Sequence, residues 1–171
     1  MQAGSGIQVQ GLSHAIGPRR ILQGITLRLD APRIGIIGRN GSGKSTLARL
    51  LAGLVAPTEG RVLIEGVDVC KDRRAAIATV GILFQNPEHQ FTRATVAAEI
   101  ASALAGTDPH GPLGADELRK LREALCPRAL DPVSPFVLSG GQKRRLGIFL
   151  AVAANRRLLL LDEPLAHLDS P

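Results

Sequence analysis

One segment of the chain combines glycines, a lysine and hydroxyl residues at a spacing suited to phosphate. Residues 38–46 read GRNGSGKST, which has the GxxxxGK[ST] spacing of a phosphate-binding loop. Gly38, Gly41 and Gly43 let the backbone curl until its amides converge on phosphate oxygens, and the helix expected next adds its positive end. Lys44 supplies a positive charge. The spacing predicts nucleotide binding, without specifying a reaction.

The other residues of this loop add polar groups to the same site. Ser45 offers a hydroxyl to Mg²⁺, and Thr46 offers one to an α-phosphate oxygen. Asn40 and Ser42 lie within the loop and are expected to line the bound nucleotide. A nucleotide carrying Mg²⁺ is therefore the expected ligand.

Two acidic residues follow an apolar run in the last part of the chain. The run Leu158–Leu161 ends at Asp162 and Glu163. Asp162 is expected to hold the hydration shell of Mg²⁺, and Glu163 to orient an attacking water or accept its proton. A solvated acid pair is the alternative, which the phosphate loop makes less favoured. Gln85 also ends an apolar run, and its amide is a candidate contact for metal and water.

The elements that position these residues are expected to alternate between strands and helices. Short β-branched runs separated by Gly and Pro predict strands at residues 7–9, 25–29, 34–37, 62–64 and 80–84. Leu158–Leu161 suits a central strand buried on both faces. Residues 95–104 and 116–125 read as helical, and Leu118, Leu121 and Leu125 fall on one helix face. This alternation predicts an α/β fold with a parallel sheet.

Composition limits the class of protein. The chain has 171 residues, 44% of them hydrophobic and 21% charged, which excludes a disordered chain and predicts one ordinary domain. We expect neither a spanning helix nor a secretory signal, and so a cytosolic location. Cys70 and Cys126 have no metal-ligand or CxxC spacing and are expected to be reduced, half-buried thiols.

Charge and aromatic content bear on possible partners. The formal net charge is +6, but the basic residues are spread along the chain. Four Phe and no Tyr or Trp offer few stacking platforms, so we expect no nucleic-acid partner.

A short motif connects these features to a family. Residues 138–142 read LSGGQ, and the chain continues to LLLLDEP at 158–164. This segment resembles the signature of ATP-binding cassette (ABC) ATPases. Ser139, Gly140 and Gly141 are expected to open a helix and form a second anion-binding end. The resemblance implies that these residues and Gln142 contact nucleotide.

The resemblance covers nearly the whole chain and implies its architecture. The fold expected is a P-loop NTPase core with a mainly parallel central sheet, an N-terminal antiparallel β subdomain and an inserted helical subdomain. We expect one domain over 1–171, with a β-rich part at 1–85, the helical subdomain at 86–137, and the signature helix, acidic strand and D-loop at 138–171. Gln85 matches the Q-loop and Asp169 the D-loop.

The family resemblance also implies partners and a reaction. Two protomers, identical or related, would pair head to tail, so that the signature of one caps the γ-phosphate held by the loop of the other. ATP and Mg²⁺ are the implied ligands. The implied catalytic residues are Lys44, Gln85 and Glu163. The residues implied to contact the metal are Ser45, Gln85 and Asp162.

A second segment resembles one branch of the family. Residues 84–91 read FQNPEHQF and are similar to the ATPase subunits of energy-coupling factor importers of vitamins or of cobalt and nickel ions. An ATP-hydrolysing subunit at the cytoplasmic face of the membrane is implied, powering import through a separate transmembrane subunit. The sequence does not specify the transported substrate. For residues 87–91 we expect only a rigid proline turn.

The chain departs from the family pattern in two places. Where members usually carry an aromatic residue for adenine, this chain offers Ile16, with His14 nearby as an expected surface imidazole. His167 lies inside the D-loop and does not match the family's switch histidine, so a truncated chain lacking the last core strands is expected.

Two other functions compete with the importer hypothesis. The missing switch histidine is compatible with a truncated nucleotide-binding module without useful turnover. A DNA-repair or chromosome-organising ATPase is disfavoured, because residues 86–137 are too compact for a coiled-coil or zinc-binding insertion.

Overall fold

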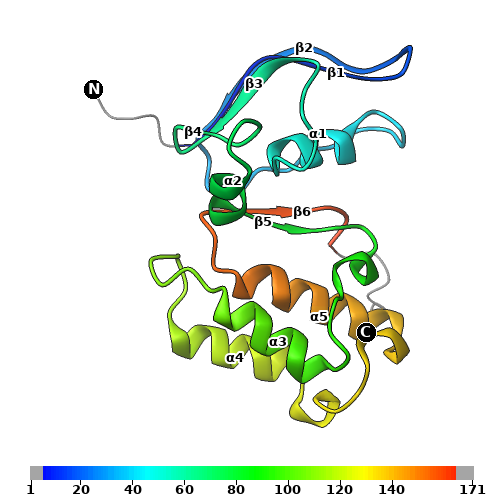
Figure 1. Ribbon diagram of the computed structural model, residues 1–171, viewed down its shortest axis with the longest axis vertical. Coiled ribbons are helices and arrows are strands. Elements are labelled where there is room, and N and C mark those ends of the chain that lie inside the picture. Colours follow the sequence, from blue (N-terminus) through cyan, green and yellow to red (C-terminus); the bar gives the residue numbers. More distant parts are fainter. Residues whose placement is uncertain (1–5, 165–171) are drawn as a thin grey trace. The chain divides into compact units, whose positions relative to one another are not determined.

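The structure is a computed structural model that describes residues 6–164. The chain forms two compact units that meet in sequence between Thr79 and Val80, and each is described by itself (Figure 1).

The first unit is built on an antiparallel sheet with the strand order β2-β1-β3-β4. Its strands are β1 (Ile7–Ile16), β2 (Arg19–Leu29), β3 (Glu59–Ile64) and β4 (Val67–Asp68). Ile7 lies opposite Leu29 of β2 and Ile64 of β3. Ile7 and Val9 are buried at the two-residue spacing of one sheet face, as the apolar pattern of the sequence predicts.

Two helices accompany this sheet. They are α1 (Lys44–Leu51) and α2 (Arg73–Thr79), and α1 contacts β3. Leu50 and Leu51, at the end of α1, are buried. Directly after α1 the chain turns at Gly53, whose φ is +65° and where a Cβ would lie only 2.3 Å from the carbonyl oxygen of Val69. Only glycine fits this turn, which fixes the end of the helix that begins at the phosphate loop.

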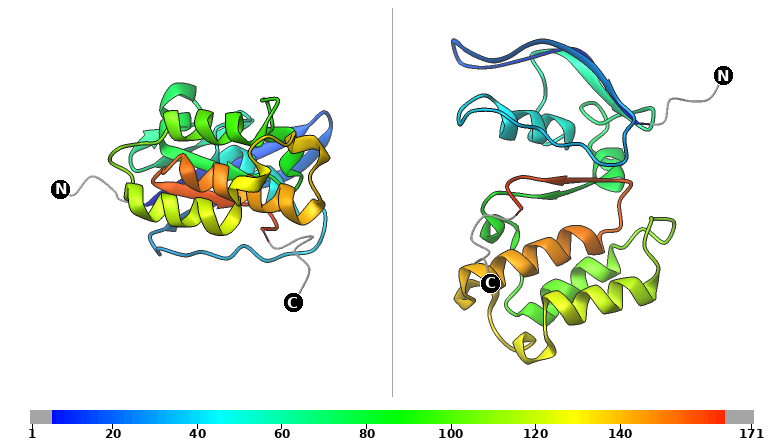
Figure 2. Two further views of the ribbon diagram at one scale, coloured as in Figure 1. Left: turned by 90° about the horizontal axis from the view of Figure 1, so that it is seen from below. Right: turned by 180° about the vertical axis from the view of Figure 1, so that it is seen from behind.

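The second unit combines a pair of parallel strands with helices. Its elements are β5 (Val80–Leu83), η1 (Pro87–Gln90), α3 (Val96–Ala105), α4 (Ala115–Leu125), η2 (Arg128–Leu130), η3 (Pro135–Val137), α5 (Gly140–Ala153) and β6 (Leu158–Leu161). β5 pairs with β6 in register from Val80 with Leu158. Helix α5 lies against β5, and α3 and α4 pack on α5 (Figures 1 and 2).

A hydrophobic core joins the helices of the second unit. It contains the fully buried Phe149 of α5 and Val96 and Ile100 of α3. Leu121 and Leu125 of α4 pack against it, as the predicted helix face requires. Helix α3 begins where the side chain of Thr95 accepts a hydrogen bond from the backbone of Ala98. The two predicted helices are therefore confirmed, with bounds shifted by one residue.

The α/β class is confirmed, but two strand predictions differ from the structure. Residues 34–37 form no strand, and Ile37 is 98% exposed. A strand requires a hydrogen-bonded partner, and the sheet of the first unit does not include this segment. Leu158–Leu161 is a strand, but within residues 6–164 it pairs only with β5, which leaves Leu161 45% exposed rather than buried on both faces.

His14 is buried, which corrects its expected position at the surface. It lies on the buried face of β1 with 9% of its surface exposed. Its Nδ1 has no hydrogen-bond partner among the described residues. Its neighbour Ile16, at the end of the strand, is 62% exposed.

None of the helices in the described part of the chain combines the length and the apolar character needed to cross a membrane.

Candidate functional site

The phosphate loop lies in the first unit and leads directly into α1. Gly41 and Gly43 have φ values of +79° and +95°, so both adopt the left-handed conformation that the curled loop requires. A Cβ at Gly43 would also lie 2.8 Å from Cδ2 of Leu22. The backbone amide of Ser42 donates to the carbonyl of Arg39, closing a tight turn before the helix.

The Lys44 side chain folds back over this loop. Its Nζ donates to the carbonyl oxygens of Gly38 at 2.8 Å and of Arg39 at 3.0 Å. The ammonium group is therefore held beside the backbone that is expected to bind phosphate. Ser45 and Thr46 follow in the first turn of α1, where backbone N–H groups lack helical partners and favour an anion.

The other candidate residues lie in the second unit, at the carboxyl ends of its two strands. Gln85 follows β5, and Asp162 and Glu163 follow β6. Nε2 of Gln85 donates to Oε2 of Glu163 at 2.8 Å, so two residues far apart in sequence meet here. The backbone amide of Asp162 donates to the carbonyl of Leu83 at 3.0 Å and extends the strand pairing by one residue.

Glu163 has an unusual backbone conformation. Its φ is +50°, in the left-handed region that residues other than glycine rarely adopt. Such a conformation persists where the surrounding contacts fix it, and it is most frequent at functional sites.

A buried arginine, which the sequence analysis did not identify, contacts the backbone around Glu163. Arg144 of α5 is 2% exposed, and all of its guanidinium hydrogen bonds go to backbone carbonyls. Nη1 donates to Phe84 (2.7 Å) and Gln85 (3.0 Å), Nη2 to Asp162 (2.8 Å) and Glu163, and Nε to Pro164 (3.0 Å). We call these five acceptors the carbonyl cluster.

Burial and the neighbouring carboxylates act on the charge of Arg144 in opposite directions. Burial lowers the pKa of its guanidinium, while the carboxylates of Asp162 and Glu163 act to raise that pKa. The five N–H donors of a guanidinium are matched here by five acceptors, so its burial leaves no donor unpaired. The spacing of buried residues gave no indication of this, since the buried Leu146 and Phe149 lie about 140–160° around the helix from Arg144.

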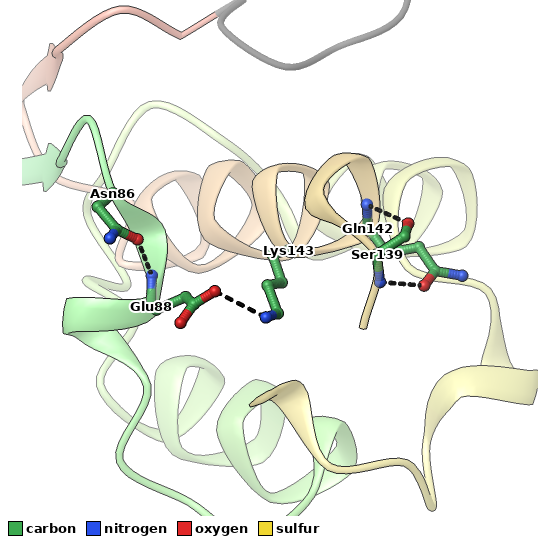
Figure 3. Close-up of polar contacts among 5 residues, drawn as sticks. All are labelled: Asn86, Glu88, Ser139, Gln142 and Lys143. Atoms are coloured by element: carbon green, nitrogen blue, oxygen red, sulfur yellow. Dashed lines mark hydrogen bonds and ion pairs between the residues drawn. The ribbon is translucent and has the colours of Figure 1, made fainter. Parts of the chain in front are cut away.

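The signature residues begin α5 as predicted. Ser139 is the residue before the helix, and its hydroxyl accepts from the backbone amide of Gln142 at 3.3 Å. Oε1 of Gln142 in turn accepts from the amide of Ser139 at 2.9 Å (Figure 3). This reciprocal pair fixes the start of the helix. Gly140 and Gly141 form its first turn, where the backbone amides point outward.

The FQNPEHQF segment forms a short turn fastened to α5. Asn86 lies just before η1, and its Oδ1 accepts a hydrogen bond from the backbone amide of Glu88 (Figure 3). The carboxylate of Glu88 pairs with Nζ of Lys143 at 2.7 Å. A Cβ at Gly147 would lie 2.8 Å from Cβ of Pro87, so helix and turn are in close contact. The expected proline turn is present, with one face covered by the signature helix.

Some candidate residues are not joined by the described contacts. The phosphate loop belongs to one unit, whereas Gln85, Asp162, Glu163 and the signature belong to the other. Asp169 and His167 lie outside the described residues. In the part of the chain that is described, no three His, Cys, Asp or Glu side chains gather as a metal site.

Comparison with known proteins places the chain in a family. Residues 22–166 match the ABC transporter family. The chain belongs to this family. The match includes the phosphate loop, the signature and both acids, so the resemblance carried by these motifs is confirmed.

Individual relatives agree with this membership. The chain is 42% identical over 154 residues to the biotin transport ATP-binding protein BioM of Rhodobacter capsulatus, covering 88% of this chain and 64% of that protein. It is 40% identical over 177 residues to the energy-coupling factor transporter ATP-binding protein EcfA2 of Symbiobacterium thermophilum. That match covers 95% of this chain and 60% of that protein. The chain thus spans less than two thirds of the length of either relative.

A solved structure agrees with the fold. The dimeric ATP-binding cassette MJ0796, in a post-hydrolysis state bound to ADP and Pi, matches with a TM-score of 0.76 and 25% identity. The match covers 96% of this chain and 76% of that one.

Proposed function

We propose that this chain is the ATP-binding and ATP-hydrolysing part of a transporter. The observation that carries the proposal is the phosphate loop, in which left-handed glycines curl the backbone and Lys44 folds back on the Gly38 and Arg39 carbonyls. This arrangement supports a triphosphate site at the start of the helix. We assign ATP binding to Gly38, Asn40, Gly41, Ser42, Gly43, Lys44, Ser45 and Thr46.

A divalent cation suits the residues that are present. The Ser45 hydroxyl and the Asp162 carboxylate are oxygen ligands of the kind that Mg²⁺ prefers, and phosphate oxygens and water complete such sites. Mg²⁺ bound with ATP would neutralise phosphate charge.

Glu163 and Gln85 are assigned to the attacking water. In the proposed reaction the water oxygen bonds to the γ-phosphorus, the bond to the ADP oxygen breaks, and Glu163 accepts the proton of the water. The contact between Nε2 of Gln85 and Oε2 of Glu163 supports this assignment, because a water replacing that contact would meet both side chains.

The signature end of α5 is assigned to a second protomer. Ser139 and Gly140 are exposed at the helix start, and with Gly141 and Gln142 they offer the donors that an anion requires. We propose that this end caps the γ-phosphate bound by the phosphate loop of a partner in a head-to-tail dimer. The dimeric state of MJ0796 supports pairing.

The likeness to biotin and energy-coupling factor ATPases supports vitamin import as the transport task, with transition-metal uptake as the other substrate class. The proposed site of action is the cytoplasmic face of the membrane, beside a separate transmembrane subunit. The division into 1–85, 86–137 and 138–171 remains part of this proposal.

The test is nucleotide binding by the Lys44→Ala variant. Hydrogen bonds to a charged group contribute about 1.5–3 kcal/mol, so affinity for Mg-ATP should fall roughly 10- to 150-fold. Lys71→Ala is the matched control, because the Lys71 side chain lies in the same unit and is 81% exposed. Equal affinity in the Lys44→Ala variant and the unaltered protein would refute the assignment of the loop.

A further inference from the structure

The Arg144 side chain holds the backbone on both sides of Glu163. The carbonyls of Asp162 and Glu163 belong to the two peptide groups that flank the Glu163 Cα, and Nη2 donates to both. Rotation about φ or ψ of Glu163 moves one of these carbonyls relative to the other. A single rigid guanidinium bonded to both therefore fixes the two angles together.

This restraint falls on a residue whose backbone conformation requires one. A left-handed φ at a residue other than glycine costs on the order of 1–3 kcal/mol and needs compensating contacts. At Glu163 these contacts include the hydrogen bond that Nη2 of Arg144 donates to the Glu163 carbonyl. Nε of Arg144 donates to the carbonyl of Pro164, the next residue. Without the guanidinium, the segment after β6 is free to relax to an ordinary conformation, which turns the carboxylate elsewhere.

The same guanidinium also fixes the segment that carries Gln85. Nη1 donates to the carbonyls of Phe84 and Gln85, at the end of β5. The two side chains that meet at 2.8 Å are thus carried by backbones bonded to one rigid planar group. Arg144 itself does not contact the reacting positions, because its donors are all used on the carbonyl cluster.

The helix that carries Arg144 is anchored at its start. The reciprocal bonds of Ser139 and Gln142 fix the first turn of α5, and the Lys143–Glu88 pair fastens the next residue to η1 (Figure 3). The Arg144 side chain therefore connects the anchored first turn of α5 directly to the backbone of Glu163.

We propose that Arg144 is a positioning residue, which holds the Glu163 backbone in its left-handed conformation and so aims the Glu163 carboxylate and the Gln85 amide at the attacking water. This inference rests on the proposed ATPase function. Lysine cannot replace Arg144, because an ammonium is a point charge with three N–H donors and cannot bond five separate carbonyls.

The experiment measures phosphate release and its dependence on ATP in the full-length protein, with Arg144→Lys and Arg144→Gln. The matched control is Arg122→Lys, since Arg122 is also buried and donates to the Cys126 carbonyl and to Asp131, away from Glu163. A misplacement of about 1 Å costs up to 10²-fold in rate, so kcat should fall about 10- to 100-fold in the Arg144 variants. The KM for ATP should change less than about 3-fold, because the phosphate loop is intact.

A second readout separates positioning from stability. The melting temperature should fall similarly in Arg144→Lys and Arg122→Lys, whereas only the former should lose kcat. In single-turnover measurements on a Glu163→Ala background, Arg144→Lys should lower the residual rate by less than about 10-fold, because without Glu163 only the positioning of Gln85 is left to lose.

Each contrary outcome is distinct. Equal kcat in Arg144→Lys and Arg122→Lys, or an undiminished effect without Glu163, would overturn the inference alone. Failure of both Arg144 variants to fold, while Arg122→Lys folds, would assign Arg144 to stability and overturn it as well. Absence of phosphate release from the unaltered protein would instead overturn the proposed function, and this inference with it.

Discussion

Gly147 of α5 lies where the signature helix meets the Q-loop segment, and replacing it with alanine should destabilise the second unit. The added Cβ would lie 2.8 Å from Cβ of Pro87 and 3.0 Å from Cδ1 of Leu83. Neither neighbour can yield easily, because Pro87 is a rigid ring in η1 and Leu83 is fully buried. Overpacking of this kind costs about 1–3 kcal/mol.

A smaller gain opposes this cost. Alanine is better than glycine in a helix interior by about 1 kcal/mol, so an overpacking cost of about 2 kcal/mol, the middle of its range, lowers the free energy of unfolding by a net value of about 1 kcal/mol. With a urea slope of about 2 kcal/mol/M, the midpoint should move down by roughly 0.5 M.

The assay is urea unfolding followed by circular dichroism without nucleotide. Gly106→Ala, at the end of α3, is the matched control, since its Cβ would meet nothing closer than 3.6 Å. It should change the free energy of unfolding by no more than about 0.5 kcal/mol. A Gly147→Ala variant as stable as the unaltered protein would refute the close contact between α5 and η1.

Four further outcomes follow from the described residues. Burial raises the pKa of Cys126 from 9.0 to about 11; alkylation by iodoacetamide at pH 8 should therefore be about 100-fold slower in the folded protein than in urea, and equal rates would contradict its burial. Because the folded pKa is the higher one, the contribution of Cys126 to stability is present below pH 9 and should be lost as the pH rises through 11, as unfolding curves measured across that range would show. Phe149→Ala should lower the free energy of unfolding by about 3–5 kcal/mol in urea titration, since Phe149 is fully buried in the helical core, and a loss below 1 kcal/mol or so would contradict that. Ile16→Tyr should tighten ATP binding by about 5-fold if adenine stacks there, while no gain in a binding titration would place the base elsewhere.

The sequence predicted features that depend on local chemistry. The phosphate loop was recognisable because a tightly curled backbone requires glycines at fixed places, with a lysine directly after them. Gly41 and Gly43 have left-handed φ angles, and the Lys44 side chain donates to the Gly38 carbonyl. The predicted helices were recognisable for a similar reason, since Leu121 and Leu125 reveal the buried face by their spacing alone.

Features that depend on distant partners were predicted less well. Residues 34–37 have the apolar, β-branched composition of a strand but do not form one. A strand forms only beside another strand, and the composition of a segment does not show whether such a neighbour is present. The burial of His14 was also not predicted. It depends on which face of β1 the residue occupies, and the register shifts along β1 decide that face.

Arg144 shows why part of the site could not be read from the sequence. It stands in the run KRR, which suits a solvated helix surface, and its five acceptors come from segments 18 to 20 and 59 to 60 residues away. The acceptors are backbone carbonyls, which any residue supplies, so no side-chain pattern marks them. The left-handed φ of Glu163 is equally invisible in its residue type.

The central claim is hydrolysis of ATP with Glu163 as the base, and phosphate release from Mg-ATP tests it most directly. The measurement compares the purified full-length protein with its Glu163→Ala variant. We predict release by the full-length protein and a loss of about 10²- to 10⁴-fold in the variant, the usual contribution of a general base. Equal release with and without Glu163, or none from the full-length protein, would contradict the account.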